Sequence, residues 1–413
     1  MSWTNNRPER RVRSAKAALT AGVLAAWLLA ASPVVAGAYE EYRSISRTLE
    51  EKPATAKEAV DRFEKRWERG TPSERTMAAY LRLRVSLYLT DFPRALKATE
   101  KLLALNPDRE QKAGLFKLGA QLSYQTEGWK DVLPYVERWE SVAGSAAKTG
   151  ETYAEMASLA AYALWQQEKV KASVPWMRRA FDASPREERG TFLLAAWQKL
   201  GDEKAQLDFL PTMVKLYGRP RYWGQWGYLT YEAGEPKKAL DILSAADKAG
   251  RLPPTLYPLL VDLEMREGAA TKAVSVLVGH PRHFEPGVYR ALLIAAYLKA
   301  GDREKALDAS LAILKNEGRR AGAGTMPGAN EELAARLAFS EEKWALAYEK
   351  TAALAERDRD DAKKADLWRF MAGVAAYEQK DWAKARGMFG AVTDKKLKKG
   401  AEAWIEQINF LAD

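Results

Sequence analysis

Residues 234–239 read Gly-Glu-Pro-Lys-Lys-Ala, residues 268–273 read Gly-Ala-Ala-Thr-Lys-Ala, and residues 301–306 read Gly-Asp-Arg-Glu-Lys-Ala. These segments begin 34 and then 33 residues apart, and each places an alanine five residues after a glycine. The residues between them favour helices. A period of this length is typical of an α-solenoid, in which helical hairpins stack on their neighbours. Because solenoids generally use extended surfaces for binding, the pattern favours a binding function over catalysis.

The same pattern continues over nearly the whole chain. If the alanine marks the start of the second helix of a pair, the equivalent residues are Ala95, Val132, Ala172, Ala205, Ala239, Ala273, Ala306, Ala345 and Ala385. They predict about nine hairpins, and a tenth if residues 55–67 belong to one. No segment of useful length has the period of a strand. We therefore expect an all-α superhelix, with an N-terminal helical cap at 39–72, repeats at 73–400 and a capping helix at 401–413.

Composition indicates a folded protein without thiol chemistry. Of the 413 residues, 47% are hydrophobic and 29% are charged, which excludes a disordered chain. Cysteine is absent, so disulfides and thiolate metal sites are excluded. The formal net charge is +10, of which residues 1–38 contribute four positive charges, leaving +6 for the remainder. This mild excess fits acidic protein partners or anionic surfaces, and it does not indicate nucleic-acid binding.

The first 38 residues resemble a secretory signal. Basic residues between Arg7 and Lys16 precede an apolar run at 17–31, and Ala36-Gly37-Ala38 matches a cleavage site. We therefore predict a cleavable signal peptide at 1–38 and a location in the periplasm. The Arg10-Arg11 pair leaves twin-arginine export open. An uncleaved membrane anchor is a further alternative, because about 20 apolar-leaning residues in this region could just span a bilayer.

The repeat resembles the tetratricopeptide family. In that family a small residue at repeat position 20 is followed by proline at position 32, and Ala95 and Pro107 are twelve residues apart. Trp223, Gly227 and Ala239 match positions 4, 8 and 20. Small residues at these places let paired helices approach to about 8–10 Å. The resemblance implies tetratricopeptide-like hairpins and a concave groove that binds protein partners.

Residues 222–285 also resemble periplasmic tetratricopeptide proteins of TonB–ExbB–ExbD systems. The similar segments are Tyr222-Trp223-Gly224-Gln225-Trp226-Gly227, Lys237-Lys238-Ala239-Leu240 and Asp247-Lys248-Ala249-Gly250. This resemblance implies protein partners among the components of an envelope complex, with membrane contact only through those partners or through an uncleaved signal. A scaffold for outer-membrane or exopolysaccharide assembly is the alternative function.

The resemblance also implies which side chains line the groove. In the family these are positions 2, 5, 9, 12 and 13 of each repeat. In the repeats of Ala95, Ala205, Ala239 and Ala273, the residues that we assign to those positions are Tyr80, Arg84, Tyr88, Trp197, Arg221, Tyr228, Tyr231 and Arg266. Tyrosine, tryptophan and arginine dominate the energetics of protein interfaces. The alternative is that an aromatic residue at helical spacing belongs to the core.

Catalytic and cofactor motifs do not occur in the sequence. It lacks the nucleophile elbow, the zinc-protease motif and the phosphate loop, so we expect no enzyme, no catalytic residue and no cofactor. His280 and His283 are the chain's two histidines, and we interpret them as part of a turn, because a metal site needs a further ligand. A peptidoglycan-active enzyme is the least favoured alternative. We expect a loop at 318–330, and a solvated basic cluster at 395–399 that could alternatively contact anionic lipid or an acidic partner.

Overall fold

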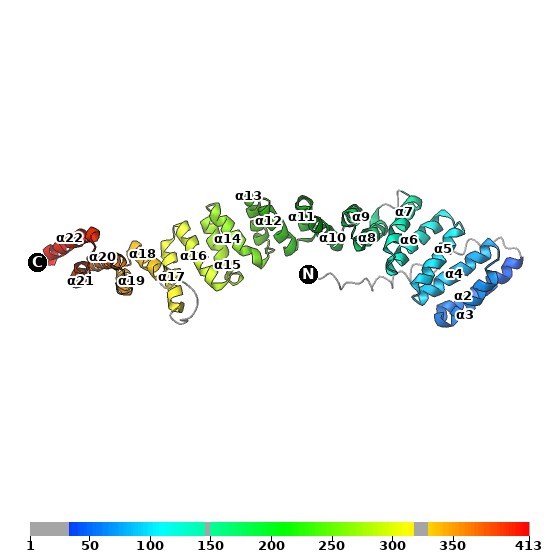
Figure 1. Ribbon diagram of the computed structural model, residues 1–413, viewed down its shortest axis with the longest axis horizontal. Helices are drawn as coiled ribbons and strands as arrows, with labels where there is room; N and C mark the ends of the chain where they lie inside the picture. The colour runs from blue at the N-terminus through cyan, green and yellow to red at the C-terminus, as the bar shows by residue number, and fades with distance from the viewer. Residues whose placement is uncertain (1–32, 145–148, 318–328, 413) are drawn as a thin grey trace. The chain divides into compact units, whose positions relative to one another are not determined.

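The computed structural model describes residues 33–144, 149–317 and 329–412, and every regular element in these ranges is a helix (Figure 1). The all-α prediction is confirmed. The predicted signal segment up to residue 32 and the predicted loop at 318–328 lie outside the described residues. The α-helices are α2 (Pro33–Glu51), α3 (Pro53–Trp67), α4 (Pro72–Tyr88), α5 (Phe92–Ala104), α6 (Arg109–Gln125), α7 (Trp129–Ala143), α8 (Gly150–Gln166), α9 (Val170–Ala183), α10 (Glu187–Leu200), α11 (Glu203–Tyr217), α12 (Pro220–Glu232), α13 (Pro236–Lys248), α14 (Tyr257–Arg266), α15 (Ala270–Gly279), α16 (Pro286–Ala300), α17 (Arg303–Glu317), α18 (Ala329–Ser340), α19 (Trp344–Arg357), α20 (Ala362–Glu378), α21 (Trp382–Gly390) and α22 (Lys395–Ala412). Two short 3₁₀ helices are η2 (Pro254–Leu256) and η3 (Pro281–His283).

Consecutive helices pair into hairpins, whose first helix we call helix A and whose second we call helix B. Within the described ranges the pairs run from α2–α3 to α20–α21, and α22 follows alone. The chain divides into two compact units, one ending at Phe209 and the other beginning at Leu210 within α11. In each unit helix B of one hairpin packs on helix A of the next, as α5 packs on α6 and α15 on α16. Stacked helical hairpins are thus confirmed within each unit.

Nine hairpin turns share one backbone geometry. In each, one residue adopts a left-handed conformation, and the N–H of the next residue donates to the carbonyl five residues before it, as Glu235 donates to Thr230. This is the Schellman closure of helix A, and the donating residue immediately precedes helix B. Glycine takes the left-handed conformation without strain, which explains the glycines of the repeated segments. The nine left-handed residues are Thr90, Glu127, Glu168, Gly201, Gly234, Gly268, Gly301, Glu342 and Lys380.

The residue five positions after the left-handed one is buried in all nine of these hairpins. It is Ala95, Val132, Ser173, Gln206, Ala239, Ala273, Ala306, Ala347 or Ala385. Three predicted equivalents were therefore wrong by one or two residues: Ala172 and Ala345 are exposed and Ala205 is half-buried. Where the turn residue is a glutamate, as at Glu168 and Glu342, no glycine marks the turn, and the alanine in the sequence is a poor guide to the buried position.

Glycine on helix A allows close approach of helix B. A Cβ added to Gly227 would lie 2.4 Å from the Leu243 side chain, and one added to Gly373 would lie 2.6 Å from the Phe389 ring. Leu243 and Phe389 are buried, so they fill the space left by the missing Cβ. Both contacts join residues 16 apart, at the same place in their hairpins. The small residues of the pattern therefore mark helix crossings.

A buried arginine fastens α10 to α8 in the first unit. Arg189 is 3% exposed, and its guanidinium donates to the carboxylate of Glu151 (2.8 Å), the carbonyl of Ser184 (2.6 Å) and the hydroxyl of Ser158 (3.2 Å). Burial acts to raise the pKa of Glu151, but hydrogen bonds from Arg189 and Ser184, with the charges of Arg189 and Arg186, outweigh it and lower this pKa to about 2. The pairing of the buried Arg189 charge with the Glu151 carboxylate offsets the free-energy cost of its burial.

The predicted N-terminal cap is a further hairpin. α2 begins at Pro33, and its residues Ala38, Tyr42 and Leu49 are buried against α3 and α4. The predicted boundary at residue 39 therefore falls inside α2. Pro53, the predicted break, opens α3, because the fixed φ of proline suits the first turn of a helix.

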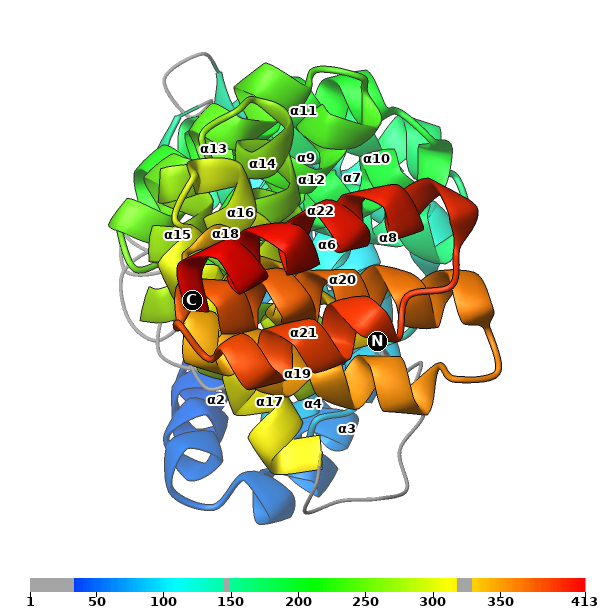
Figure 2. The same ribbon diagram turned by 90° about the vertical axis from the view of Figure 1, so that its left-hand side faces the viewer.

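The last helix begins earlier than predicted. α22 starts at Lys395, where a helix at 401–413 was predicted, and it lies beside α20 and α21 (Figure 2). The fully buried carboxylate of Asp366 accepts hydrogen bonds from the N–H groups of Thr393 (2.7 Å) and Asp394 (2.6 Å), which fixes the preceding turn. Asp394 in turn accepts from the N–H of Lys396 (2.9 Å) and starts the helix. The basic cluster at 395–399 thus occupies the first turns of α22.

Candidate partner-binding surface

The predicted groove residues of α4 lie beside α2. The Arg84 guanidinium donates to the Glu50 carboxylate of α2 at 3.0 Å, and only 17% of the arginine side chain is exposed. Tyr88 is half-buried against the core shared by α2, α3 and α4. Burial raises the pKa of the Tyr80 hydroxyl, and the nearby Tyr42 raises it further. In the first unit these side chains therefore serve helix packing.

Trp197 was wrongly predicted to line the groove. It is 8% exposed, and its ring packs edge-to-face on Phe209, with 5.2 Å between ring centroids. The reason is the register of this hairpin. Since Gln206 and not Ala205 is the buried residue of helix B, Trp197 moves from repeat position 12 to position 11. Its carbonyl accepts the turn hydrogen bond from Asp202, at the place that Thr230 occupies in the α12 hairpin.

Tyr228, Tyr231 and Arg266 come together in the second unit, on α12 and α14. Arg266 is exposed and pairs with Asp262 one turn earlier (2.9 Å). The interaction with Asp262 chiefly raises the pKa of Arg266, and the nearby Tyr231 raises it further. Tyr228 is 46% exposed, and the negative charge of Glu232 raises the pKa of its hydroxyl. These three side chains form a cluster in which Tyr228 and Arg266 are exposed and Tyr231 is half-buried.

Arg221 lies on the same side of α12, two helical turns before Tyr228. Its guanidinium carbon lies 4.6 Å from the centroid of the Tyr222 ring, and it donates to the hydroxyl of that tyrosine. Tyr222 is 1% exposed. Arg221 therefore lies over a buried ring at the start of the helix, apart from the cluster around Tyr231.

Three residues that the sequence interpretation missed extend this cluster onto α16. Met265, Leu298 and Lys299 occupy the places on α14 and α16 that Tyr231 and Glu232 mark on α12, because Tyr231, Met265 and Leu298 each lie eight residues before the buried alanine of helix B. Leu298 is 37% exposed, and the Lys299 ammonium donates to the Met265 carbonyl. Positions 12 and 13 of the Ala306 repeat would have given Leu298 and Lys299, and position 12 of the Ala273 repeat would have given Met265. We call Tyr228, Tyr231, Met265, Arg266, Leu298 and Lys299 together the α12–α16 face.

His280 and His283 pack against Tyr257 at the connection from α15 to α16. Their ring centroids lie 4.4 Å and 4.8 Å from that of Tyr257. The Tyr257 hydroxyl donates to the Asp247 carboxylate at 3.0 Å, and His280 Nε2 lies 3.3 Å from the same oxygen. Burial first, and then this hydrogen bond, raise the pKa of Tyr257 to about 12. The two histidines thus belong to a structured turn, and no group of three or more possible metal ligands occurs in the described part of the chain.

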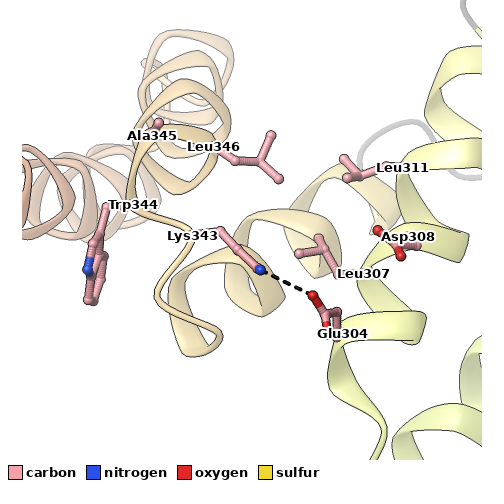
Figure 3. A pocket seen from close by; sticks show the side chains of 8 residues that line it. All are labelled: Glu304, Leu307, Asp308, Leu311, Lys343, Trp344, Ala345 and Leu346. Atoms are coloured by element: carbon pink, nitrogen blue, oxygen red, sulfur yellow. Dashed lines mark hydrogen bonds and ion pairs between the residues drawn. The ribbon is translucent and has the colours of Figure 1, made fainter.

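An open groove of about 390 Å³ lies between α17 and the start of α19 (Figure 3). Lys343 reaches across it to Glu304 (3.1 Å), while Trp344 points away from this pair. Both charged side chains are at least half exposed, so the ion pair contributes little to the stability of the fold. The lining residues are Glu304, Leu307, Asp308, Leu311, Lys343, Trp344, Ala345 and Leu346. The groove is a shallow surface feature on the helix B side.

None of the helices in the described ranges combines the length and the apolar composition that crossing a bilayer requires.

Comparison with known proteins gives matches only among solved structures. No protein-family model and no curated protein matches the sequence. The structure of Naa15/Naa10 bound to HypK-THB has a TM-score of 0.40 at 12% identity, over 80% of this chain and 66% of that chain, just under two thirds. YrrB, described as a TPR protein with an unusual peptide-binding site, has a TM-score of 0.31 at 17% identity, over 45% and 91%. MamA from Desulfovibrio magneticus RS-1 has a TM-score of 0.28 at 16% identity, over 52% and 95%.

The chain's own packing decides the type of repeat. Gly373, Ala385 and Phe389 supply the glycine, alanine and phenylalanine of the tetratricopeptide pattern at its spacing, and the Phe389 ring covers Gly373 as that pattern requires. The repeat is of the tetratricopeptide type. The tetratricopeptide hairpins differ in whether the groove positions of helix A are open to solvent. Among the predicted groove residues, those on α12 and α14 are at least partly open to solvent.

Proposed function

We propose that this protein is a non-catalytic scaffold that binds protein partners through the α12–α16 face. The observation that carries the proposal is the repeated presentation, on three successive A helices, of a half-exposed apolar side chain beside a charged one. These pairs are Tyr231 with Glu232, Met265 with Arg266, and Leu298 with Lys299. Tyrosine and arginine supply large contact areas and strong hydrogen bonds, and they are enriched among the residues that dominate binding energy.

We further propose that the protein acts in the periplasm as part of a TonB-type transport complex. The support for export is the basic, apolar and small-residue order of residues 1–38. The support for the partner is the local resemblance of residues 222–285 to the tetratricopeptide proteins of such systems.

Affinity capture tests the proposal. The tagged full chain is used to retain proteins from solubilised bacterial envelopes, in parallel with a variant carrying Tyr231→Ala and Arg266→Ala. We expect TonB, ExbB or a TonB-dependent receptor to be retained by the parent chain and lost with the double variant. Recovery of polysaccharide or barrel-assembly proteins instead would refute the TonB assignment.

Arg178→Ala is the matched control. Arg178 lies on a B helix, α9, and pairs with Asp182 at 3.1 Å with the same four-residue spacing as Arg266 and Asp262. Capture should survive this change, because it removes an equivalent exposed ion pair from a different surface. Equal loss with both variants would show that the α12–α16 face has no special role.

A further inference from the structure

The groove between α17 and α19 has an apolar floor that belongs to the core of the second unit. Leu307 is 3% exposed, and Leu311 and Leu346 are half-buried side chains packed against the same hydrophobic cluster. Leu346 projects from α19 toward Leu311 on α17 (Figure 3). The volume of about 390 Å³ lies at the lower end of the range for ligand pockets, so the groove has room for a few side chains of a partner.

The rim of this groove carries more negative than positive charge. Among the described residues that line it, Glu304 and Asp308 lie one turn apart on α17, and Lys343 is the single cation. Lys343 pairs with Glu304, and both side chains are more than half exposed, so this pair is weak. The Asp308 side chain is exposed and has no hydrogen bond or ion pair with any residue in the described ranges. The groove therefore offers one unused carboxylate beside apolar side chains.

This groove is separate from the α12–α16 face. Its lining residues belong to two B helices, α17 and α19, and to Lys343 immediately before α19, whereas the face is formed by A helices. Trp344 packs edge-to-face on Phe339 of α18, with 5.4 Å between ring centroids, and it points away from the groove. The tryptophan at the edge of the groove therefore does not fill it.

We infer that this groove is a second docking site, which takes a short segment of a partner protein that places leucine-like side chains beside an arginine or lysine. The apolar side chains contact Leu311 and Leu346, and the cation pairs with Asp308. Burial of the apolar side chains supplies most of the affinity, because each contributes more than an exposed ion pair. The charge selects between partners, since a like-charged segment is repelled. This inference goes beyond the proposed function, because it gives the scaffold another surface for a further partner.

Synthetic peptides test the inference on the full chain. The probe is fluorescein-labelled Gly-Arg-Leu-Leu-Arg-Gly. One control replaces both arginines with glutamate, and the other replaces both leucines with serine. Fluorescence anisotropy gives the dissociation constants. We expect the glutamate peptide to bind about fivefold more weakly than the probe, because an exposed pair changes from attraction to repulsion. The serine peptide should bind at least about tenfold more weakly, because apolar burial is lost.

Asp308→Lys should reverse the preference between the arginine and glutamate peptides. Its matched control is Asp241→Lys, on the B helix α13. Asp241 is exposed, its side chain has no partner within the described ranges, and like Asp308 it lies two residues after the buried alanine of its helix. The control variant should keep the preference of the parent chain.

Ala345→Trp tests the groove itself. Ala345 is exposed and lines the groove near the start of α19, so a tryptophan there occupies the space without entering the core. It should weaken binding of the probe at least about tenfold, because the leucines of the probe are no longer buried. Ala172→Trp is the matched control, since Ala172 is an exposed alanine near the start of another B helix, α9. Circular dichroism checks that each variant keeps its helices.

A photoreactive leucine analogue in the probe locates the site. Cross-links should fall within residues 304–311 and 343–346, which contain all the lining residues.

The inference is overturned by no binding of the probe at concentrations up to about 1 mM, by equal binding of the glutamate peptide, by equal effects of Asp308→Lys and Asp241→Lys, or by cross-links outside the groove. It is also overturned if sedimentation shows self-association of the full chain that Ala345→Trp abolishes, because the occupant is then a second copy of this chain. None of these measurements involves Tyr231 or Arg266, so their failure leaves the proposed function standing.

Discussion

Replacing Gly373 with alanine should destabilise the last hairpin by forcing two helices apart. Gly373 lies on α20, where the added Cβ would approach the Phe389 ring of α21 to 2.6 Å. This is far inside normal van der Waals contact. The ring cannot swing away freely, because it is 1% exposed and packs against Phe370 and Trp404, with centroid distances of 5.5 Å and 6.0 Å. The strain must therefore be relieved by a shift of α21 or by an unfavourable rotamer.

The expected magnitude comes from two opposing terms. Overpacking a well-filled core costs about 1–3 kcal/mol. Alanine in place of glycine within a helix recovers about 1 kcal/mol. Gly387→Ala on α21 isolates the second term, because Gly387 is exposed and an added Cβ there would meet nothing within 4 Å. The free energy of unfolding should therefore be lower for Gly373→Ala than for Gly387→Ala by about 1–3 kcal/mol.

Urea denaturation followed by tryptophan fluorescence measures this difference, since Trp382 and Trp404 lie in the affected core. Amide hydrogen exchange in α20 and α21 localises it to the hairpin. Adding Phe389→Leu to Gly373→Ala should restore part of the loss, because the smaller side chain vacates the space that the ring occupied. If the two alanine variants had equal stability, the packing of helix B against a glycine of helix A would not explain the pattern.

Three further predictions concern the turns and the titrating groups. Gly268→Ala should destabilise the protein by about 1 kcal/mol, and Glu342→Gly should stabilise it by a similar amount. Both residues adopt left-handed backbone conformations, which cost residues other than glycine about 1–2 kcal/mol. Urea midpoints measure both changes in stability, and effects of the same sign would contradict the turn assignment. The lowered pKa of Glu151 gives stability that is present above about pH 4.5 and is lost as the pH falls towards 2. Because its carboxylate is 35% exposed, we expect the free energy of unfolding to fall over this range by only about 1 kcal/mol more in the parent than in Glu151→Gln. Acid titrations of stability that run parallel for the two proteins would argue against this. The raised pKa of Tyr257 gives stability that is present below pH 10 and is lost as the pH rises to 12. Over that range the free energy of unfolding of the parent should fall by about 2 kcal/mol relative to that of Tyr257→Phe, as measured by urea unfolding at each pH. A difference in stability that does not change with pH would disprove the linkage.

The sequence predicted the hairpin turn well where glycine occupies it. The five-residue offset between Gly234 and Ala239 is a structural distance, from the left-handed residue to the buried residue of helix B, and it holds in all nine turns of this type. The sequence does not reveal this offset where the left-handed residue is Thr90 or Glu168, because those residue types do not by themselves indicate a left-handed conformation. Turn geometry there is imposed by the packing of the two helices.

The error at Trp197 followed from abandoning this offset. Counting five residues from Gly201 leads to Gln206, which is 4% exposed, whereas the small-residue criterion selected Ala205. A glutamine at a buried helix crossing departs from the usual preference for small residues. The residue-type criterion and the five-residue offset therefore indicated different positions, and the structure agrees with the offset. Since successive residues of a helix point about 100° apart, one position of slip moved the tryptophan from the groove to the core.

The partly exposed apolar side chains of the α12–α16 face do not continue onto the next hairpin. Tyr231, Met265 and Leu298 are 34 and 33 residues apart in the sequence, and each is a partly exposed apolar side chain. The equivalent residue on α18 is Phe339, 41 residues beyond Leu298, and its ring turns onto Trp344 with 5.4 Å between centroids. This series of side chains therefore ends at α16. A partner that binds the α12–α16 face therefore has three such side chains to contact.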